Sequence, residues 1–137
     1  MQVATVRWVG GEEFLSEMPS GHAVVFDADR KHNSAPGPME MLLGALGACS
    51  SVDVVVILEK KRQKLISLEI EISGERAPEP PTVWTKIDMV YRLTGVLDEK
   101  AVRDAIDLSQ TKYCSVAATL RKTAEITYRF EISPPRP

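Results

Sequence analysis

The chain contains 137 residues, with 17 lysines and arginines against 19 aspartates and glutamates, for a formal net charge of −2. This length is typical of one domain, and we expect a single domain over residues 1–133 and a proline-rich tail over residues 134–137. The charge balance lacks the basic excess of nucleic-acid-binding proteins, so we expect no nucleic-acid partner. The first residues lack the basic region and apolar run of a secretory signal, so we expect a cytoplasmic protein.

The N-terminal third of the sequence predicts a three-stranded antiparallel meander. Three segments have the composition of strands, and turns that contain glycine separate them: residues 3–9, 14–18 and 22–27. A polar loop follows, and the prolines Pro36 and Pro38 place the start of the next helix at its end.

A long apolar segment over residues 38–62 predicts one helix. Pro38 suits a first helical position, Glu40 is a first-turn carboxylate, and three cations lie near the other end. The segment is apolar on nearly every side, which is typical of a helix buried in the middle of a protein. Small residues surround Cys49, so a second backbone could approach there. The segment is long enough to span a membrane, but Glu40 and Asp53 would be costly in hydrocarbon, so we expect no membrane.

The second half of the chain predicts two strands, two helices and a last strand. The apolar residues Ile66, Leu68, Ile70 and Ile72 alternate with polar ones, and a second alternating segment covers residues 83–93. Pairing of these strands would bring Lys86 and Arg92 across from Glu69 and Glu71. Asp98 predicts the cap of a helix over residues 99–109, a short helix begins at Cys114 or Ser115, and the last strand covers residues 124–132.

This order of elements predicts an α+β fold with antiparallel sheets around a long central helix. One small sheet and two lesser helices cannot cover a helix that is apolar on all faces. A second subunit can cover the remainder. We therefore expect a homodimer whose two long helices lie at or near the shared core.

Few residues offer reactive chemistry. The sequence contains no glycine-rich phosphate-binding motif and no nucleophile elbow, so we expect no cofactor. A zinc site from His22, His32, Cys49 and Cys114 would lack the short paired spacings of such sites, so we expect no metal. His22 and His32 are expected to be solvated.

The two cysteines are the remaining candidates. A position at a helix N-terminus would favour the thiolate of Cys114, whereas Cys49 lies among apolar residues and needs a nearby cation to react. Either cysteine taken alone could equally be a small buried apolar residue. Their positions in the sequence do not show whether they meet.

Two segments resemble the OsmC/Ohr family. Residues 38–49 are similar to the family's Pro-x-Glu-Leu-Leu helix that ends in a cysteine, and residues 112–117 are similar to its second cysteine box. The resemblance covers most of the chain and implies an intertwined homodimer with two active sites at the subunit interface. It also implies that Cys49 and Cys114 reduce organic hydroperoxides, and that an external dithiol then restores both thiols.

The chain departs from the family pattern at the remaining site residues. In the Ohr branch a glutamate directly after the proline holds an arginine over the thiolate, but here Met39 occupies that position and the carboxylate is Glu40. Glu40 precedes Cys49 by about 900° of helical rotation, on the opposite side of the helix, which also fits a carboxylate that serves the helix N-terminus. The resemblance implies Arg30 as the arginine, with Arg7 as the alternative.

Three functions remain open at this stage. The cysteine pair favours a peroxidase with Cys49, Cys114, Arg30 and Glu40 as its site. The absence of the glutamate after Pro38 favours a non-enzymatic dimer of the same fold that binds a small hydrophobic molecule or senses oxidants. The third is a structural module whose cysteines are incidental.

Overall fold

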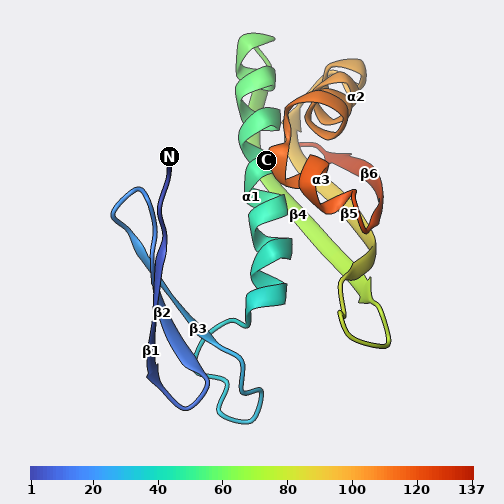
Figure 1. Ribbon diagram of the computed structural model, residues 1–137. Helices are drawn as coiled ribbons and strands as arrows, with labels where there is room; N and C mark the ends of the chain where they lie inside the picture. Colours follow the sequence, from blue (N-terminus) through green and yellow to red (C-terminus); the bar gives the residue numbers. More distant parts are fainter. The chain divides into compact units, whose positions relative to one another are not determined.

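The computed structural model describes residues 1–137 and contains two compact units, Met1–Gly44 and Ala45–Pro137. Figure 1 shows the elements of each unit along the chain. The first unit holds a small sheet, and the second holds a larger sheet and most of the helical residues.

The first unit contains the predicted meander. Strands β1 (Thr5–Gly10), β2 (Glu13–Glu17) and β3 (Ala23–Asp27) pair in sequence order, and both pairings are antiparallel. The turn between β1 and β2 requires glycine because Gly10 and Gly11 have φ values of 127° and 51°. The meander predicted from the sequence is therefore confirmed.

Helix α1 covers Pro38–Lys60, which agrees with the predicted start at Pro38 and ends two residues before the predicted end. Glu40 stabilises this start, since its Oε1 accepts a 2.9 Å hydrogen bond from the backbone N–H of Gly37. The boundary between the two units falls within the helix.

The second unit contains strands β4 (Lys64–Arg76), β5 (Trp84–Val96) and β6 (Glu125–Ser133), in the sheet order β4-β5-β6. Strands β4 and β5 are antiparallel, but β5 and β6 are parallel. The prediction of purely antiparallel sheets was therefore wrong. Parallel pairing needs a long crossover, which helix α2 (Glu99–Leu108), the π-helical turn η1 (Ser109–Tyr113) and helix α3 (Ser115–Leu120) provide.

The register of β4 and β5 confirms their predicted pairing and corrects its details. Arg92 lies opposite Glu69 and forms an ion pair with Glu71, whereas Lys86 lies opposite Glu75. A bulge between Leu65 and Ser67 leaves Ile66 64% exposed, although alternation predicted that Ile66 faces the core.

The helices of the second unit cover one face of its sheet. Alternate residues of β5 on that face are buried: Ile87, Met89, Tyr91 and Leu93. Ser50 of α1 and Gln110 of η1 both hydrogen-bond to Tyr91, so α1 and the crossover pack on the same side. This face holds the core of the unit.

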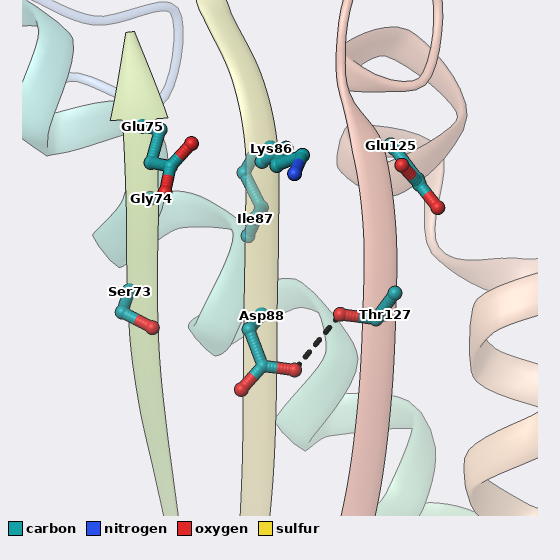
Figure 2. Close-up of a pocket in the computed structure, with 8 residues that line it drawn as sticks. All are labelled: Ser73, Gly74, Glu75, Lys86, Ile87, Asp88, Glu125 and Thr127. Atoms are coloured by element: carbon teal, nitrogen blue, oxygen red, sulfur yellow. Dashed lines mark hydrogen bonds between the residues drawn. The ribbon is translucent and has the colours of Figure 1, made fainter.

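The opposite face of this sheet is polar. A hollow of about 450 Å³ lies on it. Asp88 of β5 accepts a 2.8 Å hydrogen bond there from Thr127 of β6 (Figure 2). The side chains of Ser73, Lys86 and Glu125 also lie on this surface (Figure 2). The sheet is thus covered by helices on one side and carries a charged surface on the other.

One chain covers helix α1 only in part, in agreement with the expectation that a single sheet and two lesser helices cannot cover it. One stripe at four-residue spacing is buried: Leu46, Ser50, Val54 and Leu58. Large apolar residues elsewhere on the helix are exposed: Leu42, Val52, Val55 and Val56. By length and composition α1 could also cross a membrane, but the polar groups of its buried stripe pack against protein.

Candidate thiol site

The fold brings the two cysteines together. Cys114 is the N-cap residue of α3, and its sulfur accepts a 3.4 Å hydrogen bond from the backbone N–H of Ala117. Its side chain also interacts with that of Cys49 on α1. Cys114 is buried and Cys49 is half-buried, and both are free thiols. Residues far apart in the sequence thus form a thiol pair between α1 and the start of α3.

The pKa of Cys114 is raised to about 11. Burial is the largest cause, because it disfavours the charged thiolate, and the contacts with Cys49 and the charge of Asp53 raise the pKa further. The hydrogen bond from Ala117 lowers the pKa but does not offset these effects. The helix N-terminus therefore favours the thiolate of Cys114, as expected, but burial outweighs this effect.

A π-helical turn positions Cys114. The backbone N–H of Cys114 donates a 2.8 Å hydrogen bond to the carbonyl oxygen of Ser109, five residues earlier. This wider turn ends α2, and Cys114 then adopts an extended conformation with φ −74° and ψ 100°. Turns of this kind occur frequently at functional sites.

A chain of hydrogen bonds whose middle members are buried connects the elements that carry the two cysteines. It runs from a cation at one end to a carboxylate at the other, through Arg121, Gln110, Tyr91, Ser50, Ser109 and Asp53. Its donor–acceptor distances lie between 2.5 and 2.8 Å. We call these six residues the polar chain. Ser50 directly follows Cys49, and Asp53 lies one helical turn after it.

The other two predicted site residues, Arg30 and Glu40, lie in the first unit and pair with each other. Arg30 Nη1 is 3.6 Å from Glu40 Oε1. The guanidinium also donates to the carbonyl oxygens of Asp27 and Ala35, so it holds the loop before α1. Glu40 serves the N-terminus of α1, as the alternative interpretation expected. A role for either residue beside the thiols stays a prediction.

The alternative arginine, Arg7, lies on β1. It forms an exposed ion pair with Glu17, with 2.9 Å between Nη1 and Oε1. Such a pair contributes little to stability and leaves the guanidinium accessible.

An apolar hollow of about 480 Å³ lies in the second unit between α1 and the crossover. Its apolar lining comes from Val52, Val56, Ile57 and Leu108. Asp53 and Tyr113 also line it, and they are close in sequence to Cys49 and Cys114. This surface suits the alkyl part of a small molecule.

A second cluster of ionisable residues lies in the first unit. His32 Nδ1 is 2.8 Å from Glu13 Oε1 and 2.9 Å from Asp27 Oδ2. The buried Asp27 carboxylate also accepts hydrogen bonds from Ser34 and from the backbone of Asp29, and its pKa is held below its usual range chiefly by the Ser34 backbone. The contact with Asp27 raises the pKa of His32. Because protein donors already satisfy Asp27, the cluster organises the loop and has the character of a structural anchor.

Sequence reasoning missed the polar chain. It named Asp53 only as a charge within an apolar segment, and it placed Ser109 on the apolar side of a helix. The available signal was the position of small polar residues, Ser50 and Ser109, on faces that otherwise pack into the core. That pattern requires buried partners but does not identify them.

The fold and the site define a class: an α+β protein in which two free thiols from separate elements interact. A family model described as OsmC-like protein matches residues 31–129. The chain belongs to this OsmC-like family, which confirms the resemblance found in the sequence.

Two relatives are similar to this chain over nearly its whole length. Protein YhfA of Escherichia coli strain K12 is 45% identical over 130 residues, which cover 94% of this chain and 96% of that protein. The crystal structure of a hypothetical protein from Aquifex aeolicus VF5 has a TM-score of 0.89 at 30% identity, over 99% of this chain and 98% of that chain.

A more distant structure shares the fold alone. The organic hydroperoxide resistance protein OsmC from Legionella pneumophila has a TM-score of 0.71 at 13% identity, over 96% of both chains.

Proposed function

We propose that this protein is a thiol-dependent peroxidase that reduces organic hydroperoxides through Cys49 and Cys114. The observation that carries the proposal is the contact between the two thiols across 65 residues of sequence. Two cysteines that meet at a partly accessible position can form a disulfide, whereas an isolated buried cysteine is inert. Membership in a family that includes organic hydroperoxide resistance proteins supports the same reaction.

The first step oxidises Cys49. Its thiolate sulfur attacks the terminal oxygen of the hydroperoxide, the O–O bond breaks, and the alkoxide takes a proton and leaves as an alcohol. The sulfur loses two electrons and becomes a sulfenic acid. Cys49 is the attacking residue because it is the more exposed thiol and because the pKa of Cys114 is raised to about 11.

The second step forms the disulfide. The Cys114 sulfur attacks the Cys49 sulfur, the S–S bond forms, and the S–O bond breaks as hydroxide leaves and takes up a proton to give water. An external dithiol then reduces the disulfide and is itself oxidised to a disulfide. We expect a reducing compartment such as the cytoplasm to supply that dithiol.

Arg30 is our candidate for the cation that activates Cys49, with Glu40 holding its guanidinium. The proposed homodimer would assemble the site at the subunit interface, and the exposed apolar residues of α1 support such an assembly. The apolar hollow beside α1 would accept the alkyl part of the hydroperoxide.

The experiment is a turnover assay with an organic hydroperoxide and a dithiol reductant. We expect the unmodified protein to consume peroxide in many cycles and Cys49→Ser to consume none. Ser16→Ala, which removes a buried hydroxyl in the first unit, is the matched control and should retain turnover. Lack of turnover with several dithiols and several hydroperoxides would contradict the proposal.

The apolar hollow favours a second candidate function. A dimer of this fold that binds a small hydrophobic molecule would use the same surface, and Met39 in place of the family's glutamate fits a loss of catalysis. An apolar ligand that binds with equal affinity to the protein and to Cys49→Ser, in the absence of turnover, would support this second function.

A further inference from the structure

The polar chain has one possible direction of hydrogen bonding. The Asp53 carboxylate only accepts, so Ser109 must donate to it, over 2.8 Å. The single proton of Ser109 is then used, so Ser109 must accept from Ser50, and Ser50 in turn must accept from Tyr91. The Tyr91 oxygen accepts from the amide nitrogen of Gln110.

The hydrogen bonds at the Arg121 end of the polar chain have the same direction. Arg121 donates to Oε1 of Gln110, which leaves the amide nitrogen of Gln110 to face Tyr91. Every donor therefore points toward Asp53. Tyr91 is fully buried, and burial is the largest cause of its raised pKa, so its hydroxyl keeps the proton that this order requires.

Ser109 joins the two elements that carry the thiols. Its hydroxyl hydrogen-bonds to both Ser50 and Asp53 of α1, which lie at the two ends of the helical turn that follows Cys49. Its carbonyl oxygen accepts the backbone N–H of Cys114. A single fully buried residue thus contacts α1 with its side chain and Cys114 with its backbone.

We propose that Ser109 is a positioning residue that sets the approach of the Cys114 sulfur to the Cys49 sulfur, because it anchors the turn before Cys114 to α1. The inference rests on the proposed function, in which these two sulfurs form a disulfide. Disulfide formation requires the two Cβ atoms to come within about 3.5–4.5 Å, so a small displacement of η1 from α1 slows it. Loss of the Ser109 hydroxyl removes two of the bonds that prevent that displacement.

The test measures the effective concentration of the two thiols for each other. Reduced protein is equilibrated with oxidised and reduced glutathione at pH 7, where oxidised glutathione accepts two electrons and yields two thiols for each protein disulfide formed. We expect Ser109→Ala to lower the effective concentration tenfold or more. Ser16→Ala removes a buried hydroxyl elsewhere, so it should stay within twofold of the unmodified protein.

A second variant provides the test if Ser109→Ala does not fold. Asp53→Ala removes the last acceptor of the polar chain at a half-buried position and should lower the effective concentration as Ser109→Ala does. An unchanged value in Ser109→Ala, or in Asp53→Ala where Ser109→Ala does not fold, would overturn the proposal. An equal fall in Ser16→Ala would overturn it too, since the loss would then reflect general destabilisation.

The outcome separates this proposal from the proposed function. If the unmodified protein forms the disulfide with glutathione but consumes no hydroperoxide, the peroxidase proposal fails and the role of Ser109 is still decided by the variants. If no disulfide forms between Cys49 and Cys114, the role of Ser109 is overturned directly. If both hold, Ser109→Ala should also accumulate a Cys49 sulfenic acid that dimedone traps.

Discussion

The hydroxyl oxygens of Ser50 and Ser109 lie 2.8 Å apart, although 59 residues separate them in the sequence. Ser50 follows Cys49 directly, and Ser109 begins the turn that leads to Cys114. This contact places the two cysteine-bearing segments against each other. The account of the site depends on that arrangement and on the different surroundings of the two thiols.

The order of attack follows from the burial of Cys114. With a pKa of about 11, only about one Cys114 in ten thousand is a thiolate at pH 7. We expect Cys49→Ser to consume no peroxide, and Cys114→Ser to consume one equivalent and stop at a sulfenic acid. Mass spectrometry after dimedone treatment locates the adduct. An adduct on Cys114 in Cys49→Ser, with none on Cys49 in Cys114→Ser, would reverse the assignment.

The raised pKa of Cys114 also predicts a pH dependence. Below pH 11 the thiolate fraction of Cys114 rises about tenfold for each unit of pH, so disulfide formation should accelerate with rising pH between about 6 and 9. Single-turnover kinetics with trapping of the sulfenic acid at each pH measures this step. A rate that stays constant over this range would show that Cys114 is not the group whose deprotonation limits the step.

Arg30 provides the test of thiolate activation. Arg30→Ala should slow the first oxidation of Cys49 by about a hundredfold or more if the guanidinium stabilises the thiolate and the leaving alkoxide. Arg7→Ala is the comparison, because Arg7 is the alternative candidate and an exposed arginine of the same unit. Stopped-flow measurement of sulfenic acid formation compares the two variants. An unchanged rate in Arg30→Ala together with a slow Arg7→Ala would transfer the role to Arg7.

Substitutions at two glycines of α1 should distinguish an effect on folding stability from an effect on dimer assembly. A Cβ atom at Gly47 would lie 2.8 Å from Cδ1 of Ile72 in the same chain, whereas one at Gly44 would have no atom within 4 Å. Gly47→Leu should therefore lower the free energy of unfolding by about 1–3 kcal/mol through overpacking against β4. Gly44→Leu should leave it nearly unchanged and weaken the proposed dimer.

Urea denaturation and light scattering measure the two effects separately. The sequence had suggested that the small residues around Cys49 let a second backbone approach, but the nearest neighbour of a Cβ atom at Gly47, one of these residues, is Ile72 of β4. A well-folded monomer of the unmodified protein at micromolar concentration would contradict the dimer.

The order of the elements could be predicted from the sequence because its signals are local. Pro38 marks the start of α1, Asp98 caps α2, and alternating residues define β4 and β5. The parallel pairing of β6 with β5 could not be predicted in this way, since the partner of a strand depends on where the intervening crossover places it.

Local sequence signals also predicted only part of the candidate site. The resemblance to the family identified both cysteines, and the structure brings them into contact. The raised pKa of Cys114 depends on burial by distant residues, and the sequence indicated the opposite effect from its helix N-terminus alone. Ser109 gave no signal of its role, because a serine at the end of a helix has many possible partners.

The most direct test counts thiols after a single addition of peroxide. Reduced protein receives one equivalent of an organic hydroperoxide per chain, free thiols are titrated, and non-reducing electrophoresis detects covalent links between chains. The account predicts that two free thiols per chain fall to none without any link between chains, because Cys49 and Cys114 of one chain form the disulfide. Two thiols per chain that persist after prolonged exposure to excess peroxide would contradict it.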